Sequence, residues 1–201
     1  MITLPQCDDL FLKFFDPWYD DAGRKRRPFK ATFPDIMQSA SLVGYSQVQA
    51  SRINPQAQEQ VLAQISAMVD AARGDMKTYL KVEGDIDLSW IDAFDRYADR
   101  SQIHSLIERA DPKKFSNGYV VNACEFGAAL SHVLRTAQPR LVWRLDWPYW
   151  DSCLLDPKTG TVISVFHWAI KKLSEYGVDD GFAAKTKACL QILEEERKIA
   201  K

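Results

Sequence analysis

Apolar residues recur at helical spacing in the stretch that begins at Asn54. Asn54 and Pro55 have the form of an N-cap followed by a proline at the first helical position, and Gly74 stands where a helix commonly ends. Between them an apolar stripe returns every three or four residues, formed by Val61, Ile65, Met68 and Ala72. The pattern predicts one amphipathic helix between Asn54 and Gly74.

The next segment predicts a short strand followed by two helices. Thr78 to Asp87 has the composition of a strand that runs into an acidic turn. Ser89 and Asp92 are spaced as a capping box for a helix whose inward face is formed by Trp90, Ile91, Phe94, Tyr97 and Ala98. A second helix is predicted from Ser101 to Ala110, because the residue before Pro112 avoids the helical region.

Residues 117 to 137 predict a buried helix, because apolar positions surround most of its circumference. Gly127 lies in its middle, where glycine costs about 1 kcal/mol relative to alanine. We therefore expect a neighbouring element to approach the backbone closely at this residue. Two more helices, His167 to Tyr176 and Phe182 to Ala200, are predicted on either side of a break at Gly177.

Residues 141 to 147, LVWRLDW, alternate between apolar and polar in the manner of a strand with one buried face. The pattern predicts that Trp143 and Trp147 are buried and that Arg144 and Asp146 share the other face as a surface ion pair. An aromatic ligand pocket or a partner-binding face is the alternative for this stretch. Two further strands, YWDSCLL and TVISVF, are joined by the turn sequence DPKTG.

The predicted fold class is therefore α+β: mostly helical, with a small antiparallel β-meander at about residues 141–166 packed against helices. Residues 1 to about 50 show no regular period and are expected to be irregular. With 201 residues, 46% of them hydrophobic, the chain is expected to form a single domain spanning residues 1–201.

Composition excludes several classes of function. A formal net charge of -1 gives no overall field that would attract nucleic acid or an anionic membrane. No apolar run approaches the roughly 20 residues needed to span a bilayer, and the first residues lack the features of a secretory leader. Four widely spaced cysteines without metal-site spacing indicate reduced thiols. We expect a soluble cytoplasmic protein without a metal or cofactor.

Four residues could support catalysis. Glu125 and His132 are seven residues apart and lie on one side of the predicted buried helix, where a desolvated carboxylate could act as an acid or base. His167, on another element, could activate Cys153 as a nucleophile. The alternative is that Glu125 and His132 form the polar strip of an otherwise apolar helix.

Two charged segments could bind a partner. An acidic tract could dock on a basic protein and accelerate its association, and it contains Glu83, Asp85, Asp87, Asp92, Asp95 and Asp99. The basic run GRKRRPFK, with Arg24, Arg26 and Arg27, could contact phosphate or an acidic protein surface. Each segment could equally be a solvated face, and the chain has no nucleic-acid-binding motif.

Residues 125–177, from EFGAALSHVL through VFHWAIKKLSEYG, resemble small bacterial α+β proteins of the toxin-immunity kind. They share the order of a glycine-bearing helix, a tryptophan-containing strand, a hairpin, an aliphatic strand and a lysine-bearing helix. The resemblance covers about a quarter of the chain and carries no catalytic motif. It implies a cytoplasmic protein that neutralises a partner toxin by binding. A small hydrolase or transferase that uses Glu125, His132, Cys153 or His167 is the alternative hypothesis.

Overall fold

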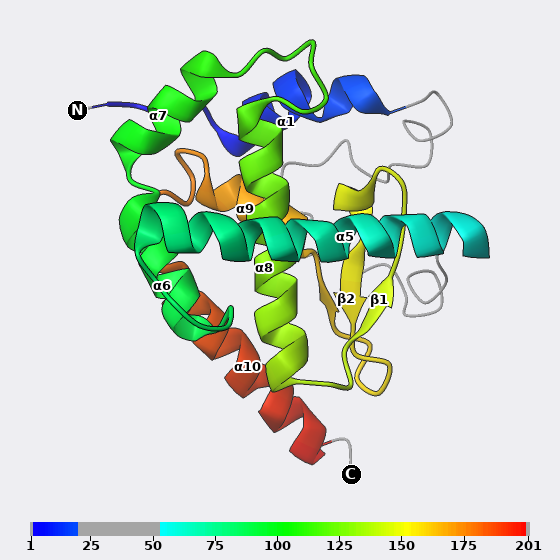
Figure 1. The fold of residues 1–201 in the computed structure, drawn as a ribbon. Coiled ribbons are helices and arrows are strands. Elements are labelled where there is room, and N and C mark those ends of the chain that lie inside the picture. The colour runs from blue at the N-terminus through cyan, green and yellow to red at the C-terminus, as the bar shows by residue number, and fades with distance from the viewer. Residues whose placement is uncertain (1, 20–52, 200–201) are drawn as a thin grey trace.

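The computed structural model describes residues 2–19 and 53–199. Its helices are α1 (Cys7–Phe14), α5 (Pro55–Asp75), α6 (Leu88–Tyr97), α7 (Arg100–Arg109), α8 (Gly118–Ala137), α9 (Val165–Lys172) and α10 (Phe182–Ile199), shown in Figure 1. Short 3-10 turns lie at Asp16–Trp18 and Tyr149–Asp151, and a π-helical turn, η2, at Met76–Leu80. The fold is α+β and mostly helical, which confirms the prediction.

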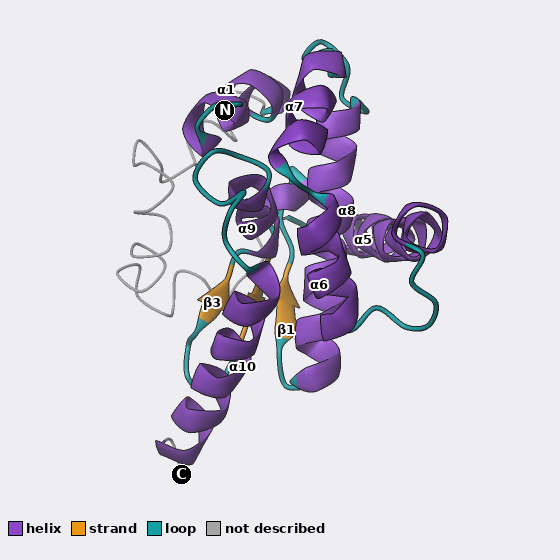
Figure 2. Cartoon of the chain, turned by 90° about the vertical axis from the view of Figure 1, so that its left-hand side faces the viewer, coloured by secondary structure: helices purple, strands orange, loops and turns teal. Residues whose placement is uncertain are grey.

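Helix α8 is the centre of the molecule. It lies between α5 on one side and α9 on the other, as the two views in Figures 1 and 2 agree. Asn117 caps its first turn by accepting the backbone N–H of Val120 at 3.0 Å. Most of its side chains are buried, including Tyr119, Phe126 and Leu130. The helix therefore fixes the positions of the elements that surround it.

Glycine at position 127 allows α8 and α9 to cross closely. A Cβ atom at Gly127 would lie 2.6 Å from Cδ1 and 2.9 Å from Cα of Phe166, which is closer than atoms can pack. The backbone of α9 therefore occupies the space that a side chain would need. This confirms the close approach predicted from the sequence.

A three-stranded antiparallel meander lies on the same side of α8 as α9 (Figure 2). Its strands are β1 (Val142–Arg144), β2 (Cys153–Leu155) and β3 (Val162–Ile163), in the order β1-β2-β3. In this register Arg144 lies opposite Cys153 and Leu154 lies opposite Ile163. The predicted meander is confirmed, although its strands are shorter than the sequence pattern suggested.

The alternation along residues 141–147 was interpreted incorrectly. Trp147 is 43% exposed and Trp143 is only partly buried, whereas Arg144 and Asp146 are 7% and 1% exposed. The strand ends at Arg144, so the two-residue period does not extend to Trp147. The predicted Arg144–Asp146 ion pair forms at 3.1 Å, but it is buried rather than at the surface.

Three local predictions between residues 74 and 92 were also wrong: the helix end at Gly74, the strand at Thr78–Asp87 and the capping box at Ser89. Gly74 does not end its helix, because α5 continues to Asp75 and into the π-helical turn η2, which occupies part of the predicted strand. Asp87, not Ser89, caps α6, and its carboxylate accepts the N–H groups of Ser89 and Trp90. The helix therefore begins earlier than the expected capping box.

Within residues 2–19 and 53–199, none of the helices has the length and apolar character required to cross a membrane.

Candidate functional site

The four residues proposed for catalysis do not form one constellation. Cys153 lies on β2 in the sheet and His167 on α9, which packs against β2, whereas Glu125 and His132 lie on α8. Glu125 is partly buried and lines a cavity whose lining includes none of the other three. The structure therefore places Cys153 and His167 in a buried polar cluster and Glu125 in a cavity, while His132, partly buried on α8, belongs to neither.

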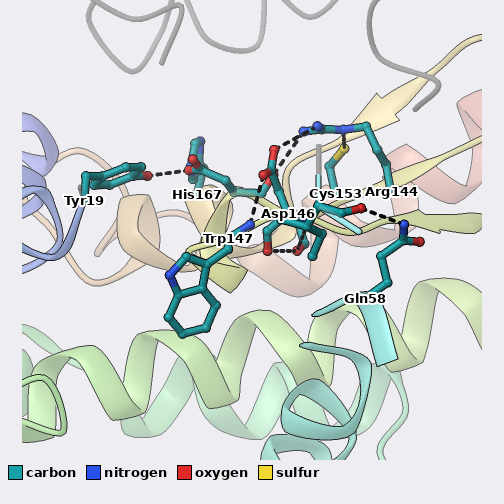
Figure 3. Close-up of polar contacts among 10 residues, drawn as sticks. Tyr19, Gln58, Arg144, Asp146, Trp147, Cys153 and His167 are labelled. Carbon is teal, nitrogen blue, oxygen red and sulfur yellow. Dashed lines mark hydrogen bonds and ion pairs between the residues drawn. The ribbon is translucent and has the colours of Figure 1, made fainter. Parts of the chain in front are cut away.

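The buried polar cluster is organised by Arg144, which lies opposite Cys153 on the paired strand. Its Nε donates to the Cys153 sulfur at 3.1 Å, its Nη1 contacts Asp146, and its Nη2 donates to the backbone oxygen of Asp151 at 3.1 Å (Figure 3). Asp146 in turn accepts the backbone N–H of Trp147 at 2.9 Å. These contacts hold the chain that connects β1 to β2.

A second set of contacts joins this connection to the N-terminal helix region. Tyr19 donates its hydroxyl hydrogen to Oδ1 of Asp151 at 2.5 Å and accepts the indole N–H of Trp150 at 3.0 Å. His167 Nε2 lies 3.7 Å from the same Asp151 oxygen. The polar groups of this cluster thus link residues 19, 144–153 and 167, which is a structural role for Cys153 and His167.

The cavity lies among α5, η2, α6, α7 and α8, and its volume is about 330 Å³. Five aromatic side chains line it: Tyr79, Trp90, Phe94, Tyr97 and Phe126. Trp90 and Phe94 are buried and stack in parallel at 5.6 Å, whereas Tyr79 and Tyr97 are exposed and lie 6.5 Å apart. The volume and the apolar walls are those of a small-molecule or side-chain binding site.

Polar groups enter this cavity from three helices. Asp75 comes from the end of α5, Glu125 and Asn122 from α8, and Gln102 and Arg109 from α7. Burial is the main cause that raises the pKa of Glu125 to about 7, and the nearby negative charge of Asp75 raises it further. Neither carboxylate forms an ion pair with any residue that the structure describes.

Trp90, which lines this cavity, has an unpaired donor. Its side chain is 3% exposed, and its indole Nε1 has no hydrogen-bond acceptor among the described residues. A buried N–H without an acceptor destabilises a folded protein, so nearly all such groups are paired. An acceptor atom supplied from within the cavity would satisfy it.

Three members of the predicted acidic tract have structural roles at helix N-termini. Asp87 caps α6 and Asp99 caps α7, where its carboxylate accepts the N–H of Gln102 at 2.8 Å. Asp95 is partly buried; it accepts the N–H of Ala183 at the start of α10 and lies 2.9 Å from Lys172 Nζ. These contacts within the chain account for the three acidic residues, so no partner protein is needed to explain them.

The remaining acidic residues are exposed. Asp92 pairs with Arg96 on the surface of α6, and Glu83 and Asp85 lie in the loop between η2 and α6. Arg24, Arg26 and Arg27 fall outside the described residues. Binding of a partner by the acidic tract therefore stays a prediction, now restricted to its exposed members.

Sequence reasoning identified Glu125 but missed the rest of its site. Trp90, Phe94 and Tyr97 were recognised as one helix face, but as part of the core. Asp75 and Tyr79 carry no local signal, because they reach Glu125 only through the crossing of α5 and α8. An acidic residue in an otherwise apolar helix was the available indication.

Comparisons with models of known families, with curated proteins and with solved structures find no match. The function is accordingly inferred from the geometry and charge of the site.

Proposed function

We propose that this protein acts by binding a basic partner protein, and that it neutralises that partner in the manner of a cytoplasmic immunity protein. One observation carries the proposal: Glu125 and Asp75 lie together in an open aromatic cavity without a cationic partner among the described residues. A basic side chain from another protein would neutralise both carboxylates while its apolar stem packs against the aromatic walls.

The surroundings of the cavity support a basic partner. Glu83 and Asp85 are exposed in the loop that joins two cavity-lining elements, η2 and α6. Exposed charges beside a binding site increase the association rate of an oppositely charged partner. Exposed aromatic residues such as Tyr79 and Tyr97, at 61% and 37%, are typical of the contact residues in protein interfaces.

The enzymatic alternative has weaker support, since Glu125 alone among the four candidate residues lines the cavity. A pKa of about 7 suits a general acid or base. Catalysis would also need a nucleophile or activated water positioned by a second group, and Cys153 is engaged by Arg144 in the buried polar cluster.

Capture of partner proteins from the native host, with two matched double variants, tests the proposal. Glu83→Lys/Asp85→Lys reverses charge beside the cavity, whereas Glu59→Lys/Glu195→Lys makes the same charge change on exposed positions at the far end of α5 and on α10. We expect the parent and the second variant to capture the same basic protein, and the first variant to recover several-fold less of it. Equal recovery by both variants, or capture of an acidic protein, would contradict the proposal.

A further inference from the structure

The chemistry of the cavity is defined by two carboxylates and one indole N–H. Glu125, which is partly buried, and Asp75, which is exposed, have no cationic partner among the described residues, and Trp90 carries a buried N–H without an acceptor. Five aromatic side chains line the same cavity. A ligand that satisfies all of these groups needs a positive charge, an apolar body and a hydrogen-bond acceptor.

We propose that the cavity binds a protonated amine on a small aromatic or apolar body, with the ammonium group against Glu125 and Asp75 and an acceptor atom towards the Trp90 indole. Aromatic rings favour such a ligand in two ways, because they pack against its apolar body and attract its positive charge. A volume of about 330 Å³ accommodates one molecule of this size. If the amine is a lysine side chain of the partner protein, this inference rests on the proposed function. A free small-molecule amine would supply the same ammonium group without that partner.

An anionic ligand is disfavoured by the balance of charge in the cavity. The single cationic side chain among the described lining residues is Arg109, which is exposed, whereas Glu125 is partly buried between aromatic walls. The titratable groups that line the cavity with Glu125 are Asp75 from α5, Tyr79 from η2, Tyr97 from α6 and Arg109 from α7. Outside the lining, the Cys124 thiol and the Tyr149 phenol interact with Glu125 electrostatically. Asp75 is the one whose charge raises the pKa of Glu125.

This site makes amine binding depend on pH. The proton and the ammonium group compete for Glu125, whose pKa is about 7 in the empty site. An alkylammonium group stays protonated from pH 6 to pH 8. Affinity should therefore rise about tenfold from pH 6 to pH 8 as Glu125 ionises, and binding below pH 7 should release a proton.

Three small molecules of matched shape separate the possibilities. Tyramine has an ammonium group and a phenol oxygen, tyrosol replaces the ammonium with a neutral hydroxyl, and 4-hydroxyphenylpropionate replaces it with a carboxylate. Calorimetric titration of the full chain at pH 8 should show tyramine binding at least tenfold more tightly than either analogue. Nα-acetyllysine amide, titrated in parallel, tests whether a lysine side chain is accepted as well as a free amine.

Variants assign the binding to the proposed groups. Glu125→Gln should weaken tyramine binding at least tenfold and abolish its pH dependence, while Glu59→Gln, at an exposed position of α5, should leave both unchanged. In ¹H–¹⁵N spectra the indole resonance of Trp90, identified by its loss in Trp90→Phe, should shift on titration. Thermal unfolding of each variant confirms that it is folded.

Tyrosol or 4-hydroxyphenylpropionate binding as tightly as tyramine would overturn the inference, as would tyramine binding that Glu125→Gln leaves unchanged or no tyramine binding at millimolar concentration. Failure here is distinct from failure of the proposed function. If the basic partner is captured but no amine binds, the cavity chemistry is wrong and the protein interface stands. If tyramine binds but both double variants capture the same proteins, the cavity chemistry stands and the docking proposal is wrong.

Discussion

The charge on Glu125 should destabilise the folded protein at neutral pH. Burial and Asp75 raise its pKa from the ordinary 4.5 to about 7, so the folded chain holds a proton that the unfolded chain has released. The stability that this proton contributes is fully present below about pH 4.5 and is lost as the pH rises through 7. Above pH 7 the protein retains an ionised carboxylate in an unfavourable site.

Replacement of Glu125 by Gln should therefore stabilise the protein at pH 8 and leave it unchanged at pH 4. We expect a gain of about 1 kcal/mol, allowing for the partial exposure of the side chain, which corresponds to about 2 to 4 °C in Tm. Thermal unfolding of parent, Glu125→Gln and the control Glu59→Gln at the two pH values measures it. A lower Tm for Glu125→Gln at pH 8 would show that the carboxylate has a stabilising partner.

Lys172 has the opposite character, since its charge is buried and fully paired. Its Nζ lies 2.9 Å from Asp95 Oδ1 and donates to the backbone oxygens of Val178 and Asp180 at 3.1 and 3.0 Å. These contacts connect α9 to α6 and to the loop before α10. The Lys172 side chain is 1% exposed, so water would not take the place of any of these contacts if it were lost.

Lys172→Met should cost about 3 to 5 kcal/mol, the range for removing one partner of a buried ion pair. Lys185→Met is the matched control, because Lys185 pairs with Asp180 at the surface and its loss should cost less than about 1 kcal/mol. Urea unfolding of the two variants gives both values. Equal costs would show that burial of the Lys172 pair adds nothing to its effect.

At the scale of elements, two glycines should respond to alanine in opposite ways. Gly127→Ala would place a methyl group against Phe166 at the crossing of α8 and α9, and overpacking of this kind costs about 1 to 3 kcal/mol. Gly74 lies exposed near the end of α5, and no atom lies within 4 Å of the point that a Cβ would occupy there, so Gly74→Ala should gain about 0.5 to 1 kcal/mol through helix propensity. Urea unfolding measures both; a stabilising Gly127→Ala would show that the helices can separate without loss.

Local patterns predicted the helices well and their ends less well. Asn54–Pro55 and Asn117 marked the true starts of α5 and α8, because an N-cap is a contact within a few residues. The predicted strand at Thr78–Asp87 failed because α5 continues into η2 and the chain then turns at Lys81, which has a positive φ of 57°. No short-range pattern in the sequence marks that extension.

The β1 strand shows why alternation alone could not place its side chains. Two-residue alternation identifies two faces, but tertiary packing decides which is covered. Arg144 and Asp146 are buried as a pair, and the 146–153 connection supplies further partners: the backbone oxygen of Asp151 accepts from Arg144, and the backbone N–H of Trp147 donates to the Asp146 carboxylate. Those partners lie beyond a turn, and the alternation along residues 141–147 carries no information about the path of that turn.

At the scale of the whole molecule, the cavity could not be predicted from the sequence. Its lining comes from α5, η2, α6, α7 and α8, and Asp75 and Glu125 are separated by 50 positions in the chain. Within its own segment, no lining side chain indicates a cavity, apart from Glu125, which is an acidic residue in an apolar helix. Their juxtaposition results from the crossing of α5 over α8 (Figure 1).

The N-terminal helix is connected to the rest of the fold by contacts that are distant in sequence. Glu175 accepts the backbone N–H of Leu4 at 2.8 Å and donates its own backbone N–H to Pro5 at 3.0 Å, while Tyr19 bonds Asp151. Cys7 on α1, Cys124 on α8 and Cys153 on β2 are all at most 4% exposed. These three thiols therefore report on the N-terminal helix, the central helix and the sheet.

If the chain is one domain, as we predict, these three thiols should become reactive together. Alkylation requires the thiolate, and burial raises the pKa of Cys7 and Cys124 to about 12, so both should be protected at pH 8 until the protein unfolds. Cys189, less buried and with a pKa raised to about 11, should be labelled first. Pulsed iodoacetamide labelling across a urea series, read by peptide mass spectrometry, should give one shared midpoint for Cys7, Cys124 and Cys153. Labelling of Cys7 at a clearly lower urea concentration than Cys124 would instead show that α1 unfolds as a separate unit, because a single cooperative transition exposes all three sites at once.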